Sequence, residues 1–102
     1  MPHHIETYGH GDRIGVVLDL SAGDAFTLRT SEFRRFARDL ALHIAAADPA
    51  DEKGEADITA LLNQPFFKDE SMTVRDLFDR CSTQLGTPVH IHRYVRLSAP
   101  GA

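Results

Sequence analysis

Six histidines are the residues of this chain best suited to bind a metal, and two of them lie close together. His90 and His92 alternate within a strand-like segment, so their imidazoles are expected on one face, at a spacing that can chelate zinc. A zinc site needs three or four ligands, and the sequence has no CxxC or HExxH pair to complete one. We therefore expect a polar strand face here and no metal site, with metal binding as a distant alternative.

Residues used in covalent catalysis occur without the neighbours that would activate them. The single cysteine, Cys81, lies on the apolar stripe of a predicted helix, where a buried thiol is the simpler interpretation. Ser21, Ser31 and Ser71 fall in predicted turns or caps, with no GxSxG pattern around them. Neither GxxxxGKS/T nor GxGxxG occurs. The sequence therefore predicts a protein that is not an enzyme and binds no cofactor of its own.

Composition places the chain among ordinary globular domains. It has 102 residues, 42% of them hydrophobic and 25% charged, with a formal net charge of −4. That length fits one domain spanning residues 1–102, in which 50–56 reads as a short acidic linker. We expect neither nucleic acid nor a membrane as a direct partner, because no strongly basic run or 20-residue apolar run stands out. A lone cysteine fits a reducing, cytoplasmic location.

Alternating apolar residues predict three strands. His4 to Tyr8 and Arg13 to Leu20 flank a glycine-containing turn at residues 9–12, which indicates a hairpin. Val89 to Leu97 is the last strand. Its expected faces are Val89, Ile91, Val95 and Leu97 on one side, and His90, His92, Tyr94 and Arg96 on the other.

Helical spacing of apolar residues predicts two long helices and a short one. The predicted helices are Ser31 to Ala47, Asp57 to Leu62 and Thr73 to Leu85, with Gln64 to Glu70 extended or looped between the last two. Thr30 or Ser31 can cap the first, Pro49 follows its end, and Gly86 suits the end of the third.

The predicted fold is α+β, a three-stranded antiparallel sheet with two to three helices packed on one face. Such a sheet leaves its other face open, and we expect Val17, Tyr94 and part of the His90/His92 pair on it. Covering that face with a second copy would give a two-fold homodimer.

Four stretches of the sequence carry a family resemblance: YGHGDRIGVVL from Tyr8, DLALHIAAADP from Asp39, LLNQPFFKDESMTV from Leu61 and RYVRL from Arg93. In this order they resemble the core domain of bacterial elongation factor Ts, and the resemblance covers Tyr8 to Leu97. Members of that family typically carry a helical insert where this chain has only ADEKGEADITA, and an N-terminal helical domain with no match here.

The resemblance implies a role without a catalytic side chain, in which the protein binds elongation factor Tu and promotes exchange of GDP for GTP. The family inserts a phenylalanine near the Mg²⁺ site of that partner, and the matching residue is Phe26. The family's preceding aspartate has become Ala25, so Asp24 would have to substitute from one position away. Packing of Phe26 against the first helix is the alternative interpretation.

A second group of residues matches the part of the family's core that docks on the third domain of elongation factor Tu. These are His10, Arg13, Ile14 and Gly15, together with His43 in the matching helix. A local packing or hydrogen-bonding role is the alternative for His43. The alternative function is a degenerate dimeric interaction module without exchange activity.

Overall fold

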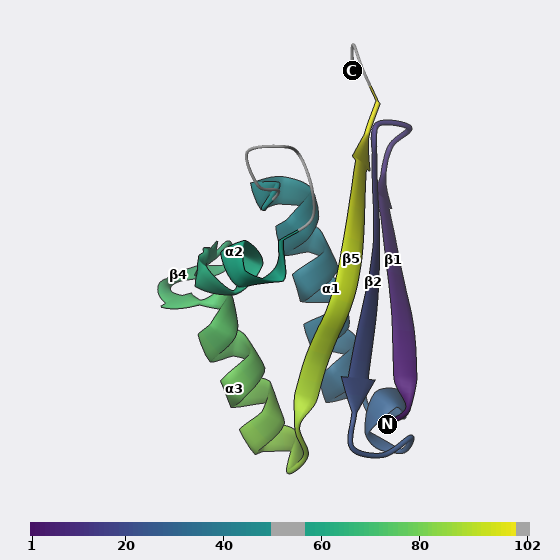
Figure 1. Ribbon diagram of the computed structural model, residues 1–102, viewed down its shortest axis with the longest axis vertical. Helices are drawn as coiled ribbons and strands as arrows, with labels where there is room; N and C mark the ends of the chain where they lie inside the picture. Colours follow the sequence, from purple (N-terminus) through teal and green to yellow (C-terminus); the bar gives the residue numbers. More distant parts are fainter. Residues whose placement is uncertain (50–56, 100–102) are drawn as a thin grey trace.

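The computed structural model describes residues 1–49 and 57–99, and its helices form one layer against a three-stranded sheet (Figure 1). The strands are β1 (His3–His10), β2 (Ile14–Ala22), β3 (Pro65–Phe66), β4 (Asp69–Thr73) and β5 (Val89–Ser98). The helices are α1 (Ser31–Ala47), α2 (Ile58–Asn63) and α3 (Val74–Leu85), with a 3-10 turn, η1, at Thr27–Arg29. The main sheet has the order β1-β2-β5 and is antiparallel throughout. The predicted α+β fold is confirmed.

The predicted hairpin of β1 and β2 is longer than the sequence pattern indicated. Pairing runs from His3 opposite Ser21 to His10 opposite Ile14, so the turn contains only residues 11–13. Gly11 has φ +60, in the left-handed region that glycine adopts at little cost.

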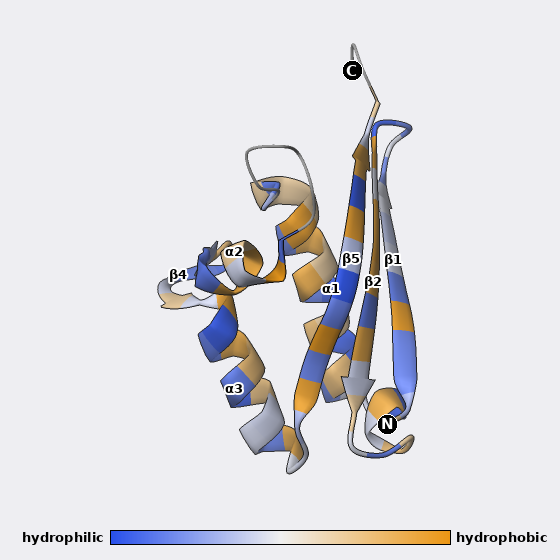
Figure 2. Cartoon of the chain, viewed as in Figure 1, coloured by the Kyte–Doolittle hydropathy of each residue, from blue (hydrophilic) through white to orange (hydrophobic). Residues whose placement is uncertain are grey.

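The centre of the sheet, β2, supplies the floor of the core. Val16, Leu18 and Leu20 lie on one face of the strand and are fully buried, as their alternation predicted. They pack under a stripe of α1 residues at helical spacing: Phe33, Phe36, Ala37, Leu40, Ala41 and Ile44. The same alternation of hydrophobic and hydrophilic residues is visible along β5 in Figure 2. Burial of the apolar face of β2 against the apolar stripe of α1 holds the helical layer on the sheet.

Polar caps fix where each helix begins. Thr30 Oγ1 accepts a hydrogen bond from Phe33 N at 3.2 Å, which confirms the predicted start of α1. Asp57 caps α2 in the same way through Ala60 N. At α3, Thr73 and Asp76 form a reciprocal capping box, and Gly86 ends the helix with φ +70.

A second, two-stranded sheet was not predicted. The segment expected to be extended or looped instead pairs β3 with β4 and crosses the helical side of the molecule. Strands of two and five residues are too short to show a period in the sequence, which is why the pattern missed them. The predicted acidic segment at 50–56 lies outside the described residues.

The prediction of which β5 side chains lie on each face of the sheet is wrong beyond Ile91, because the strand contains a bulge. Asp19 pairs with Arg93 and the next β2 residue, Leu20, pairs with Ile91, so His92 is an extra residue. A one-residue shift exchanges the two faces of the strand. Tyr94 therefore points into the core and is only 3% exposed, whereas Val95 points outward.

The hydroxyl of Tyr94 joins β5 to both chain segments that border residues 50–56. It donates to the carbonyl of Pro49 at 3.0 Å and accepts from Asp57 N at 3.0 Å. Since Pro49 follows α1 and Asp57 precedes α2, this one hydroxyl connects the helical layer to the sheet.

Replacing Tyr94 with Phe should lower the free energy of unfolding by about 1–3 kcal/mol, because the amide of Asp57 loses its acceptor. The chain has two tyrosines, and Tyr8→Phe is the matched control, since the Tyr8 hydroxyl hydrogen-bonds to His10 near the surface. Urea denaturation of both variants measures the difference. Equal losses for the two would contradict the assigned role of Tyr94.

Candidate partner-binding site

The turn after β2 presents Phe26 to solvent. The Asp24 carboxylate accepts hydrogen bonds from Thr27 N at 2.7 Å and Thr27 Oγ1 at 2.9 Å, and Thr27 itself is buried. These bonds close the turn and leave the Phe26 ring 76% exposed. Packing of Phe26 against α1 is thereby ruled out in this conformation.

Asp24 has a structural role in that turn. The hydrogen bonds from Thr27 hold the pKa of the Asp24 carboxyl below its usual value, so the charged form that accepts these bonds is favoured. Its neighbour Ala25 is exposed and carries no carboxylate. To take the role of the family's aspartate, as the resemblance implied, Asp24 would have to act while its carboxylate is hydrogen-bonded to Thr27.

Gly23 ties the same turn to the far end of α3. Its amide donates to Thr87 Oγ1 at 3.0 Å, and a Cβ atom placed on residue 23 would lie only 2.0 Å from that oxygen. Any larger residue here would displace the Thr87 hydroxyl and break this hydrogen bond. The turn that carries Phe26 is thus anchored at both of its ends, by Gly23 and by Thr27.

The second predicted group lies at the opposite end of the sheet. His10 and Arg13 are exposed at the β1–β2 turn, while Ile14 and Gly15 are partly covered at the start of β2 (Figure 1). The nine residues of β2 span about 30 Å between this turn and the loop of Phe26. The structure therefore does not bring the predicted residues together in one local site.

His43 is inside the protein, where an exposed docking residue had been expected. Its Nδ1 accepts a hydrogen bond from Phe67 N at 3.2 Å, so the ring proton is on Nε2, which donates to Gln64 Oε1 at 2.8 Å. The side chain is fully buried beside the rings of Phe66 and Phe67. His43 thus fastens the β3–β4 hairpin to α1.

Burial sets the protonation state of His43. Desolvation lowers the pKa of the imidazole, although the hydrogen bond to Gln64 opposes that shift. A protonated ring would also lose the bond from Phe67 N, because imidazolium has no acceptor. Burial likewise raises the pKa of the Cys81 thiol to about 11, which keeps it protonated and unreactive near neutral pH.

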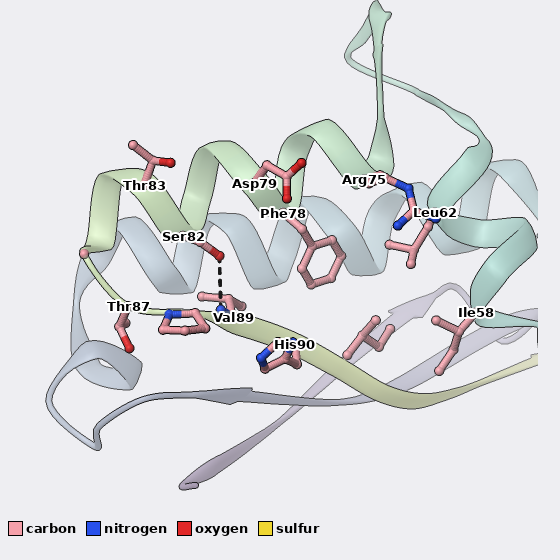
Figure 3. Close-up of a pocket in the computed structure, with 13 residues that line it drawn as sticks. Ile58, Leu62, Arg75, Phe78, Asp79, Ser82, Thr83, Thr87, Val89 and His90 are labelled. Atoms are coloured by element: carbon pink, nitrogen blue, oxygen red, sulfur yellow. Dashed lines mark hydrogen bonds between the residues drawn. The ribbon is translucent and has the colours of Figure 1, made fainter.

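A groove of about 570 Å³, which no sequence pattern indicated, lies between α3 and β5 (Figure 3). Phe78 points into it from α3, and Ile58 and Leu62 of α2 close one end. On its wall, Ser82 Oγ accepts a hydrogen bond from Val89 N at 3.1 Å, so this hydroxyl holds the start of β5.

The two histidines considered as zinc ligands have different surroundings. His90 lines the groove, whereas His92 Nε2 lies 2.7 Å from Ser21 Oγ and its ring stacks on His3. Across residues 1–49 and 57–99 there is no group of three or more histidine, cysteine, aspartate or glutamate side chains arranged to hold a metal ion. Within the same residues, no helix is both long and apolar enough to span a membrane.

Comparison with known proteins places the chain in a family. It is 33% identical to elongation factor Ts of Rubrobacter xylanophilus, over 90% of this chain and 68% of that protein. The chain belongs to the elongation factor Ts family. Identity to the elongation factors Ts of Methylacidiphilum infernorum and Alkaliphilus oremlandii is 32% and 30%, again over 90% of this chain. No family model matches the sequence.

The chain is shorter than the elongation factors Ts that it matches. It spans 65% of the M. infernorum protein and 61% of the A. oremlandii protein. The alignment with the R. xylanophilus protein covers 132 residues, more than the 102 of this chain, so that elongation factor Ts has internal residues without a counterpart here.

The buried His43 gives a testable pH dependence. Because its folded pKa lies below the unfolded value of about 6.5, the unfolded chain binds the proton more readily. The free energy of unfolding should therefore be highest above pH 6.5 and fall as the pH drops towards the folded pKa.

Urea midpoints at pH 7.5, 6.5 and 5.5 measure this slope. The His43→Gln variant should be less stable at pH 7.5 but show a flatter slope, whereas His90→Gln, at an exposed site, should retain most of the wild-type slope. A slope unchanged in His43→Gln would show that other groups control the pH dependence.

Proposed function

We propose that this chain binds elongation factor Tu and promotes release of its GDP, allowing exchange for GTP. Membership of the elongation factor Ts family supports the proposal. The observation that carries it is Phe26, an exposed aromatic ring on a turn anchored at both ends. No bond-making group is required, since a protein that binds the nucleotide-free state more tightly than the GDP-bound state displaces GDP by coupled affinities.

The fixed turn suits insertion of a ring into a partner. A loop backbone that is already ordered loses little entropy on binding, so more of the contact energy contributes to affinity. Aromatic residues that enter a partner's pocket often dominate an interface. Hydrogen bonds hold the backbone of the turn that carries Phe26, and Asp24 acts in this proposal by holding that turn through Thr27.

The exposed β1–β2 turn supplies a second contact in this proposal. His10 and Arg13 would meet elongation factor Tu about 30 Å from Phe26, so the partner would have to span the length of the sheet. Ile14 and Gly15 would contribute as the partly covered base of the turn. His43 supports the fold and makes no direct contact in this scheme.

We also propose that the open face of the sheet pairs two copies of the chain. Ile5, Val17, Val95 and Leu97 are between 45% and 71% exposed. Val17 pairs with Val95, and Leu97 follows on the same face of β5, so these three side chains form one apolar patch, with Ile5 opposite Asp19 at its edge. A dimer without exchange activity is the second candidate function, and this patch is the observation that favours it.

Replacing Phe26 with Ala should reduce GDP release from elongation factor Tu by at least about tenfold, since each 1.4 kcal/mol of lost contact energy is a factor of ten. The variant should melt at the wild-type temperature, because the ring is exposed. Release of a fluorescent GDP analogue measures the rate, and Ala25→Ser, in the same turn, is the control. Wild-type rates in Phe26→Ala would contradict the assigned role of the ring.

Replacing Val17 with Lys should convert a dimer into a monomer at micromolar concentration, because a charge would be buried in the apolar patch. Thr83→Lys, at an exposed position of α3, is the matched control and should remain dimeric. Sedimentation velocity distinguishes the two states. A wild-type chain that is monomeric at about 100 μM would end the dimer proposal.

A further inference from the structure

Four arginines lie within ten residues, around the start of α1. Arg29 ends η1, and Arg34, Arg35 and Arg38 follow on the exposed side of the helix. Within the described residues, none of these four side chains takes part in an ion pair, a hydrogen bond or a ring contact. The nearby carboxylate of Asp39 is bound by Lys68 Nζ at 2.7 Å.

The arrangement of Arg34 and Arg38 does not help the helix to fold. These two residues are four positions apart, so two like charges are neighbours on the helix surface and repel each other. Arg34 also completes the first turn, where the helix dipole favours negative charge. Arg35 has Glu32 and Asp39 beside it at helical spacing, but neither Arg34 nor Arg38 has a carboxylate three or four residues away. An external anionic group is therefore the natural explanation for this pair.

The cluster is continuous with the turn that carries Phe26. Arg29 N donates to Phe26 O at 3.0 Å, and the two residues are three positions apart in a 3-10 turn. Side chains at that spacing lie on the same side of such a turn. Arginine next to an exposed aromatic ring is also the composition of a protein-binding hot spot.

We propose that Arg29, Arg34, Arg35 and Arg38 form a basic surface that docks on an acidic surface of the protein that receives Phe26. The inference rests on the proposed function, which takes elongation factor Tu as that protein. A protein partner is favoured over nucleic acid because the chain carries a net charge of −4. A polyanion would be repelled by most of this molecule, whereas an acidic patch on a protein meets only the basic surface.

The test is the association rate with elongation factor Tu at different salt concentrations. Charge attraction mainly raises association rates and is screened by salt. At about 25 mM salt, the double variant Arg34→Gln and Arg38→Gln should associate roughly three- to tenfold more slowly than wild type. This difference in association rate between the variant and wild type should vanish at about 500 mM salt, where charges more than about 5 Å apart are screened from each other.

The matched control is Arg75→Gln with Arg93→Gln, which removes the same charge from exposed positions of α3 and β5. It should associate at nearly the wild-type rate. Melting of the Arg34/Arg38 variant should occur at or above the wild-type temperature, because a repulsion is removed, so unfolding cannot imitate the expected result.

Three results would overturn the inference while leaving the proposed function intact. One is an unchanged rate and salt dependence in the Arg34/Arg38 variant, and another is an equal loss of rate in the Arg75/Arg93 control. The third is that wild type binds a fluorescent RNA 20-mer and the Arg34/Arg38 variant does not, while both associate with elongation factor Tu at the same rate. That result would assign the surface to nucleic acid. If wild type does not bind elongation factor Tu at either salt concentration, the inference falls together with the proposed function.

Discussion

Burial of one face of β2 against α1 is the interaction on which the rest of the molecule depends. Val16, Leu18 and Leu20 meet Leu40 and its neighbours on α1, and this contact fixes the helical layer over the sheet. The residues that we propose for binding lie at or near the ends of these two elements. The turn of Phe26 connects them, and the β1–β2 turn caps the other end of β2.

Two polar contacts give this apolar core a single arrangement. The Tyr94 hydroxyl connects β5 to the segments after α1 and before α2, and the His43 imidazole connects α1 to the β3–β4 hairpin. Both side chains are buried, and both have their hydrogen bonds satisfied by groups distant in sequence. Such contacts are costly to leave incomplete, so they disfavour other packings of the same hydrophobic residues.

The elements with a strong period and clear caps could be predicted from the sequence, and the local irregularities could not. The bounds of α1 and the start of α3 follow from Thr30 and Thr73, whose side chains bond backbone amides three residues on. The faces of β5 were wrong because a bulge depends on pairing with β2, which no single strand reveals. The choice between docking and local hydrogen bonding at His43 could not be made from the sequence, since a histidine at the edge of an apolar stripe can point either way until Gln64 and Phe67 are placed. Phe26 was found through a family motif, whereas its exposure depends on the bonds between Asp24 and Thr27.

The order β1-β2-β5 also has a consequence for how the protein behaves in concentrated solution. In the part of the chain that the structure describes, β1 and β5 each pair with a neighbour on one side only, so both present open backbone edges. Open edges are where sheets join one another and aggregate. On β5 the bulge at His92 interrupts the regular edge, and Arg93 places a charge beside it. A bulge and a charged residue both hinder the pairing of an edge strand with another sheet. They allow this small fold to carry a long strand at the edge of its sheet without aggregating through it.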